Sequence, residues 1–371
     1  MEGEQGRYRI YDDDAQGERT ASEVSYGRDV RRKSTLILGG VIAMAATVLV
    51  SLVVGMPSSS VADILVRLVT FDTGDIVGWK IWRIYMPIMA AAMITGGGLA
   101  LSGTVMQCIL RNPLASPYTL GLSSAAAFGA AFAILFLDGG SATSRYISVS
   151  SPYVTTACAF GFAMVATAVI LLLTRITRVS AETMVLAGIA ISAIFSAGLT
   201  LMQYMADSTQ LGAIVSWTFG NLGKADWGWD AAIFFVGVPI VIYFMLNRWS
   251  LNAMNAGDEV AEGVGVGTAR FRMIGLVLSA LLSSILVAGF GVIAFVGLLG
   301  PHISRMIVGS DHRSLIPMSL VLGAAIMLIA DTVARTAMSP MVLPVGILTS
   351  LLGGPLFIYL LLSRSRRRTY V

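Results

Sequence analysis

The residues best suited to chemistry in this chain are few, and they do not combine into a catalytic set. His302 and His312 are the only histidines, and neither has a nucleophile and a carboxylate at a recognisable spacing. His302 follows a glycine and a proline, where it could bond a freed carbonyl, and His312 is expected to be a solvated turn residue. No carboxylates cluster at the spacing of metal ligands. We therefore expect neither catalysis nor a bound metal.

Nucleotide binding is not expected either. A P-loop needs Gly-x-x-x-x-Gly-Lys-Ser/Thr, whose backbone amides cradle phosphates, and Gly223-Lys224-Ala225 lacks the first glycine and the hydroxyl. Gly263-x-Gly265-x-Gly267 is glycine-rich but follows no strand. We expect no cofactor on this chain. If the protein moves a solute uphill, the energy must come from another subunit or from an ion gradient.

One polar loop has the character of a docking element. It runs from Leu251 to Val266, with Asp258 and Glu259 near its middle and apolar residues at helical spacing. Acidic residues stabilise a helix N-terminus through the helix dipole. A short amphipathic helix of this kind suits docking to a cytosolic partner.

A second polar segment is the compact turn Arg111-Asn112-Pro113, which separates two long apolar runs. In a membrane protein, such a turn is where two spanning helices meet water. Its specific composition indicates a surface that gates or docks, and not a simple connector.

The elements that position these segments follow from composition. Of 371 residues, 56% are hydrophobic and 12% are charged, with a mean hydropathy of +0.79. Soluble domains carry roughly 25% charged residues, so this is an integral membrane protein. No basic face with interleaved aromatics is present, so nucleic acid is not an expected partner.

The apolar runs predict an all-α architecture, because they approach the ~20 residues of a spanning helix and do not alternate like barrel strands. We predict about ten transmembrane helices, near residues 35–55, 83–107, 118–138, 152–174, 183–205, 231–247, 271–290, 292–308, 314–333 and 344–362. The eighth carries Gly300-Pro301, where proline should break the hydrogen-bond ladder. Five spans in each half would give inverted halves, as in inverted-repeat transporters.

The basic residues predict the orientation. With the N-terminus inside, 19 Lys and Arg residues fall in inner segments and six in outer ones, as the positive-inside rule requires. The chain thus divides into a cytoplasmic polar tail (1–34), a transmembrane domain (35–363) and a basic cytoplasmic tail (364–371). We expect a multi-pass protein of the plasma or inner membrane, surrounded by lipid, with both termini cytoplasmic.

Ion coupling finds little support in the spans. Ionisable groups deep in a bundle usually mark an ion path, and the predicted span centres are nearly free of charge. Asp331 and Arg335 lie at i, i+4 and are expected to pair with each other. A secondary carrier driven by an ion gradient remains the alternative reading of the composition, and a passive channel is a third.

A set of motifs in a fixed order resembles the permease subunits of ABC importers for iron–siderophore complexes, haem and cobalamin. The resemblance covers about residues 80–363 and rests on Leu101-Ser-Gly-x-x-x-Gln107, Arg111-Asn-Pro-Leu-Ala115, Leu120-Gly-x-Ser-Ser124, Leu251-Asn with Gly257-Asp-Glu and Gly265-Val, Ala294-Phe-Val-Gly-Leu-x-Gly-Pro-His302, Ala330-Asp-x-x-Ala-Arg335, Leu343-Pro-Val-Gly346 and Gly353-x-Pro355.

The resemblance implies a type II ABC importer permease that forms a homodimer with a second permease subunit and imports its substrate by alternating access. Two cytosolic ATPase subunits would bind ATP and Mg, and an extracytoplasmic binding protein would deliver the substrate. The stretch 210–223 would form a short outer helix.

The resemblance also assigns roles to particular residues. Asn112 and Leu114 would form a cytoplasmic gate, with a second constriction near Ser180. The ATPase coupling residues would be Leu251, Asn252, Gly257, Asp258, Glu259 and Gly265.

Docking of the binding protein is where the chain departs from the family. The family usually carries Arg-Leu-Pro-Arg at the start of its second span, and this chain has Tyr85-Met-Pro-Ile88. Lys80 and Arg83 lie just upstream and are the candidates to supply the missing charge. Arg335 matches the family's other docking arginine.

Overall fold

The computed structural model describes residues 2–57, 59–137, 152–177 and 181–368, and over these ranges every regular element is a helix. Side chains are described for the same ranges except 2–26, 174–177, 181–183 and 360–368. The helices are α1 (Glu2–Gly55), α2 (Val61–Thr70), α3 (Ile76–Lys80), a π-helical turn (Ile81–Tyr85), α4 (Met86–Ile109), α5 (Leu122–Phe136), α6 (Pro152–Thr177), α7 (Ala181–Met205), α8 (Ser208–Thr218), a 3₁₀ turn (Leu222–Lys224), α9 (Trp227–Leu246), α10 (Arg248–Ala256), α11 (Asp258–Gly263), α12 (Thr268–Phe290), α13 (Val296–Val308), α14 (His312–Thr336) and α15 (Val345–Arg368).

Ten apolar helices in the described ranges confirm the predicted all-α membrane architecture. Seven are long enough to cross a membrane, and three shorter ones lie in α5, α13 and α15. Five of the ten precede residue 206 and five follow it, in agreement with the predicted halves.

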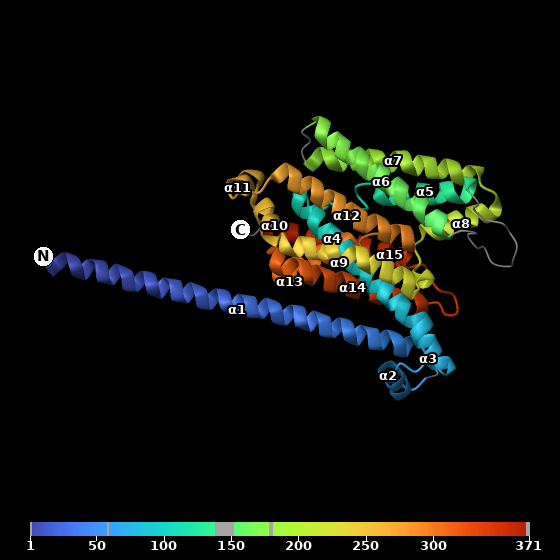
Figure 1. Ribbon diagram of the computed structural model, residues 1–371, viewed down its shortest axis with the longest axis horizontal. Coiled ribbons are helices and arrows are strands. Elements are labelled where there is room, and N and C mark those ends of the chain that lie inside the picture. The colour runs from blue at the N-terminus through green and yellow to red at the C-terminus, as the bar shows by residue number, and fades with distance from the viewer. Residues whose placement is uncertain (1, 58, 138–151, 178–180, 369–371) are drawn as a thin grey trace.

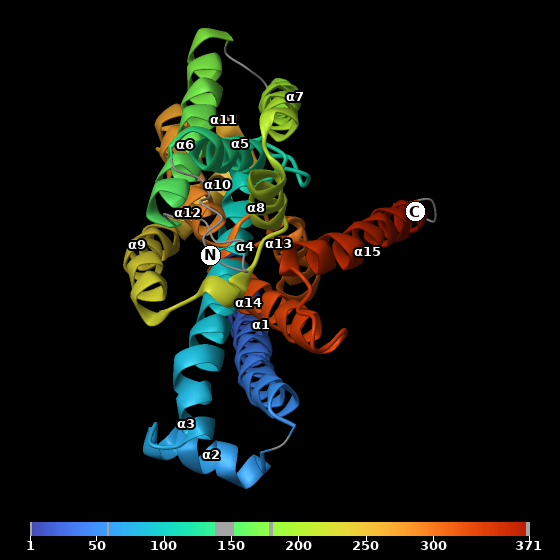
Figure 2. The same ribbon diagram turned by 90° about the vertical axis from the view of Figure 1, so that its right-hand side faces the viewer.

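Helix α4 is the centre of the bundle and packs against α14, α12, α13 and α9 (Figures 1 and 2). Small residues allow these contacts. A Cβ on Gly96 would collide with the backbone of Gly323 in α14, and one on Gly103 would collide with Gly297 in α13. These glycines therefore serve close helix packing.

The two ends of the bundle carry different elements. Figure 1 places the start of α1, the helices α10 and α11 and the C-terminal end of α15 toward one end, and α2, α3 and α8 toward the other. Helix α1 runs as a single helix from Glu2 to Gly55. Its membrane-spanning part is Gly27–Gly55.

The interruption expected at Pro301 lies elsewhere. Helix α13 runs through Pro301, and the helical path breaks upstream between Phe290 and Val296. Gly291 and Phe295 adopt positive φ angles of 81° and 65° there, which no α-helix accommodates. The proline lies near the N-terminal end of α13, where few backbone bonds are lost.

Candidate functional site

The predicted gate turn ends α4 with a Schellman motif. The Asn112 amide donates to the Gln107 carbonyl and the Arg111 amide donates to the Cys108 carbonyl, both at 3.1 Å. Arg111 takes φ +48°, the position that glycine usually fills. The Asn112 side chain then accepts the Leu114 amide at 2.9 Å. The turn is thus fixed by its own hydrogen bonds.

The segment after the turn re-enters the bundle and is not yet a spanning helix. Ser116 is buried, and its amide donates to the Thr119 hydroxyl at 2.9 Å. The Thr119 hydroxyl donates in turn to the Leu114 and Ser116 carbonyls. Irregular backbone is tolerated at membrane depth only where protein satisfies it. The predicted span at 118–138 consequently begins as a helix only at Leu122.

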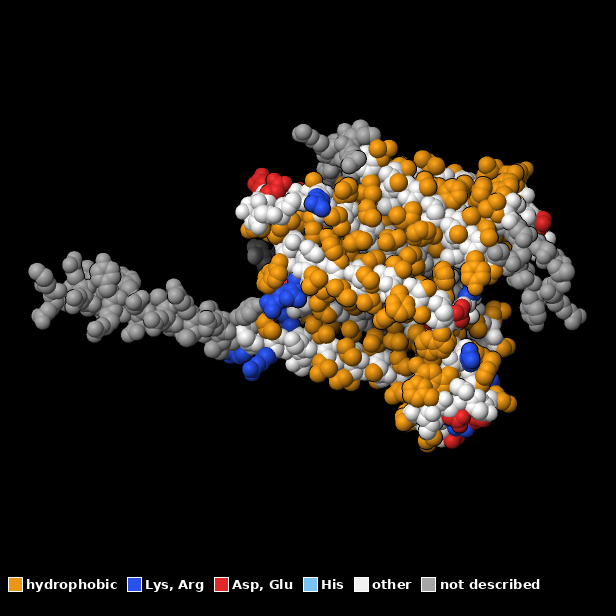
Figure 3. All heavy atoms as spheres, in the orientation of Figure 1, with side chains coloured by type: hydrophobic (Ala, Val, Ile, Leu, Met, Phe, Trp, Pro, Cys, Tyr) orange, Lys and Arg blue, Asp and Glu red, His pale blue; other side chains and the backbone are white. Residues whose placement is uncertain are grey.

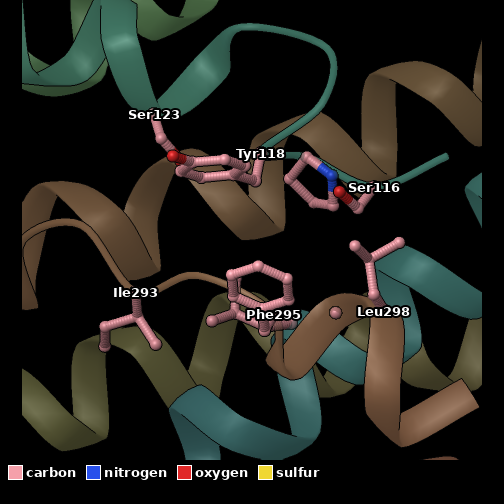
Figure 4. A pocket seen from close by; sticks show the side chains of 9 residues that line it. Ser116, Tyr118, Ser123, Ile293, Phe295 and Leu298 are labelled. Atoms are coloured by element: carbon pink, nitrogen blue, oxygen red, sulfur yellow. The ribbon is translucent and has the colours of Figure 1, made fainter. Parts of the chain in front are cut away.

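A small hollow lies beside this re-entrant segment. Ser116, Tyr118 and Ser123 border it on one side (Figure 4). Ile293 and Phe295, from the break between α12 and α13, and Leu298, from the first turn of α13, border it on the other. The re-entrant segment and the helix break therefore face each other, although neither is helical.

The two described gate candidates are accessible. Leu114 is 42% exposed and Asn112 is partly exposed. Ser180 lies outside the described residues. Gly121 and Gly188 hold the far end of the segment against α7, since a Cβ on Gly188 would meet Thr119 and Leu120 backbone atoms at 2.7 and 2.9 Å.

The predicted docking loop contains two short helices, and the first, α10, is held on the bundle by buried side chains and by a hydrogen bond from α4. Leu251 and Met254 in α10 are fully buried. The Cys108 thiol, near the end of α4, donates to the Leu251 carbonyl at 3.1 Å. Leu251 therefore holds α10 on the bundle and does not present a surface to a partner.

Asn252 has a similar internal role. Its Nδ2 donates to Asp311 Oδ1 at 2.8 Å, and its Oδ1 accepts the His312 amide at 2.9 Å. The His312 ring is buried, with its Nδ1 2.8 Å from the same Asn252 oxygen. The prediction that His312 is a solvated turn residue is therefore wrong. Asp311 also accepts the Arg313 amide and caps α14. Partial burial opposes ionisation of Asp311, but the hydrogen bonds from the Arg313 amide and Asn252, together with the positive charges of Arg313 and Lys33, lower its pKa.

Gly257 is the joint between α10 and α11. Its φ of 133° is available to glycine almost alone, and a Cβ there would lie 3.6 Å from the Arg111 guanidinium. The joint therefore lies directly beside the gate turn.

Arg272 connects α11 to the end of α4. Its Nη2 donates to both carboxylate oxygens of Asp258 at 2.9 and 2.8 Å, and its Nε donates to the Ile109 carbonyl at 3.0 Å. Ile109 is the last residue of α4 and lies two residues before Arg111 of the gate turn. One planar guanidinium thus bridges α11 and the end of α4.

The outward surface of this pair of helices is mixed. Glu259, Val260, Val264 and Gly265 are exposed, and Figure 3 shows an acidic patch over α11 at this end of the molecule. This outward surface is therefore acidic and carries two exposed valines.

The three candidates at the opposite end differ in accessibility. Lys80 and Arg83 are exposed. The Arg335 side chain is only 11% exposed and pairs with Asp331 at 2.8 Å, which confirms the predicted local pair. Its Nη2 also donates to Ser51 at 2.9 Å, and its guanidinium lies over the Tyr85 ring. This arrangement favours a structural role for Arg335 over docking.

Sequence reasoning missed Arg272, Asp311 and the outer helices α2 and α3. Only α2 had a readable signal, since Ser60 precedes Val61, Ile64, Leu65, Leu68 and Val69 at helical spacing. The Arg272 contact joins residues 163 positions apart, and no local pattern reports it.

The fold and these segments define a multi-pass membrane permease with a structured loop pair at one end. The FecCD transport family matches residues 42–363, and the chain belongs to this family of ABC transporter permeases.

Three relatives illustrate the range of the family. MJ0087 of Methanocaldococcus jannaschii, assigned as an ABC transporter permease protein, is 50% identical over 79% of this chain and 84% of its own length. The hemin transport system permease HmuU of Yersinia pestis is 38% identical over 78% and 86%. The molybdate import system permease MolB of Haemophilus influenzae is 34% identical over 87% and 94%.

A solved structure shares the fold across nearly the whole chain. It shows an inward-facing conformation of a transporter assigned to the metal-chelate type of ABC transporter. The match has a TM-score of 0.77 and 32% identity, and covers 89% of this chain and 99% of the other.

Proposed function

We propose that this permease forms a homodimer that imports a metal chelate, driven by two cytosolic ATPase subunits that seat on α10 and α11. An extracytoplasmic binding protein would deliver the substrate at the end where Lys80 and Arg83 are exposed. The proposal is supported most by the Arg272 contacts, because they join the exposed α11 to the gate turn.

The substrate class is an iron–siderophore complex, haem or cobalamin. The relative HmuU is named as a hemin permease, which supports a tetrapyrrole substrate. The relative MolB is named as a molybdate permease, so the relatives also include a carrier of a small oxyanion. The discriminating assay is uptake into proteoliposomes that contain the permease, its ATPase and its binding protein. Ferric siderophore, haem, cobalamin and molybdate are supplied in turn, and uptake of molybdate alone would contradict the proposal.

The ATPase-docking surface is tested by changing one charge at a time. Glu259→Lys alters an exposed side chain, whereas Asp258→Lys also breaks the Arg272 pair. Glu259→Lys should reduce co-purification of the ATPase and abolish uptake, and the double change with Asp258→Lys should do the same. Asp72→Lys makes the same charge change at the exposed opposite end and should leave ATPase binding intact. Full co-purification and uptake by the Glu259→Lys protein would refute the docking assignment.

A further inference from the structure

Helix α2 presents an apolar face that no other described element covers. Val61, Leu65, Val66 and Val69 are exposed, Val69 by 78%, and Phe71 continues the face beyond the helix. On the opposite side of the helix lie Asp63, Arg67 and Thr70. An α-helix with such a division of faces is the usual form of a membrane-interface helix.

The position of α2 restricts what can cover this face. Ile64 is buried in the same cluster as Leu52, Met56 and Ile81, at the neighbouring ends of α1 and the α3–α4 segment. In Figure 1, α2 lies at the margin of the bundle beyond the end of α1, and in Figure 2 it lies across the direction of α1. The helix therefore lies at the end of the bundle, beside the ends of α1 and of the α3–α4 segment, with its apolar face exposed.

Two further features fit a lipid surface. Figure 3 shows hydrophobic side chains continuing from the sides of the bundle onto this corner. Trp79 in α3 is half exposed, and Phe71 stacks on Trp82 with ring centroids 4.6 Å apart. Aromatic rings of this kind gather at membrane–water interfaces.

The basic side chain of α2 is paired with nearby carboxylates. Arg67 Nε donates to Asp75 Oδ1 at 3.0 Å, and Arg67 lies 3.4 Å from Asp63. Asp75 also accepts the Gly78 amide and caps α3, so these bonds fix α3 relative to α2. The single basic residue of α2 is therefore paired, so α2 itself offers no free basic side chain to anionic headgroups.

We propose that α2 is an interfacial helix whose Val61–Leu65–Val69 face lies in the outer boundary between headgroups and acyl chains. It binds through apolar contact and independently of lipid charge. The helix would brace the outer ends of α1 and α4 against the bilayer.

The test is spin-label accessibility in the full-length permease reconstituted into phosphatidylcholine nanodiscs. Leu65→Cys and Asp63→Cys, each combined with Cys158→Ala, place labels on opposite faces of α2. We expect the ratio of oxygen to nickel-chelate accessibility to be several-fold higher at Leu65 than at Asp63. Adding phosphatidylglycerol should leave both ratios unchanged.

Val69→Cys provides a second label on the same face if the Leu65 variant does not fold. Equal nickel-chelate accessibility at the apolar and polar positions would place the face in water and overturn the proposal. Protection of Leu65 and Val69 from both reagents would mean that protein covers the face, and this would also overturn it. If the ratio of oxygen to nickel-chelate accessibility at Leu65 rises only when phosphatidylglycerol is present, binding would depend on lipid charge, which contradicts the proposal.

Discussion

At the scale of single residues, Arg272 is the side chain on which the link between docking surface and gate depends. Arg272→Ala leaves the Ile109 carbonyl and the Asp258 carboxylate without their shared donor. Hydrogen bonds to charged groups contribute about 1.5–3 kcal/mol each, and the partial exposure of this pair favours the lower value. We expect the reconstituted complex to keep basal ATPase activity while substrate uptake falls by about tenfold, the equivalent of 1.4 kcal/mol.

The matched control is Arg270→Ala, which removes the same charge from an exposed position on the same helix. Its uptake should remain close to wild type. Arg272→Lys keeps the charge but lacks the planar fork, so it should restore uptake only in part. Full coupling in the Arg272→Ala protein would show that α11 reaches the gate turn by another route.

The residue scale also shows what local patterns can predict. Asp258 and Glu259 look equivalent in the sequence, and the prediction treated them and Leu251 alike. The structure separates them, because Asp258 pairs with Arg272, Leu251 is buried, and Glu259 alone is exposed. Each difference depends on a tertiary contact with α4 or α12, which sequence spacing does not encode.

At the scale of elements, Gly257 determines how α10 and α11 are joined. Gly257→Ala forces a Cβ into a conformation with φ 133°, at a cost on the order of 1–3 kcal/mol. We expect a lower thermal unfolding temperature of the purified permease and weaker ATPase co-purification. Gly263→Ala is the matched control, because a Cβ there meets nothing within 4 Å and its φ is not positive. Equal behaviour of the two variants would rule out a strained joint.

The junction between α10 and α14 should be acid-sensitive. The pKa of Asp311 is lowered by the fold, so its ionised form contributes stability above its ordinary pKa, and this contribution is lost as pH falls through the lowered value. Thermal unfolding followed from pH 6 to about pH 3 should show the loss mainly below about pH 4. Asp311→Asn retains a good helix cap and should have a weaker dependence on pH. An identical pH profile would remove Asp311 as the titrating group.

Helices with long apolar runs were predictable because burial in lipid requires them, and their number was confirmed. The predictions failed where the backbone adopts positive φ angles and where a non-helical segment re-enters the bundle. Arg111 and Phe295 take such angles without being glycine, so no residue type marked the turn geometry or the true break before α13.

At the scale of the whole molecule, the arrangement of the two ends makes orientation testable with one pair of residues. Glu259 in α11 and Lys80 in α3 are both exposed and lie toward opposite ends of the bundle (Figure 1). The distribution of basic residues predicts that the α11 end is cytoplasmic, since 19 of 25 Lys and Arg residues fall in the segments assigned to that side.

We therefore expect Lys80→Cys, in a Cys158→Ala background, to react with a membrane-impermeant maleimide in intact cells. Glu259→Cys should react only after the membrane is permeabilised, because the reagent cannot cross the bilayer. Cys108 is buried and should stay unlabelled in both conditions, so the Cys158→Ala chain serves as the background control. Labelling of Glu259→Cys in intact cells would contradict the predicted orientation, because α10 and α11 would then lie outside the cell, where a cytosolic ATPase cannot bind them. The same measurement therefore tests both the predicted orientation and the proposal that a cytosolic ATPase drives this permease.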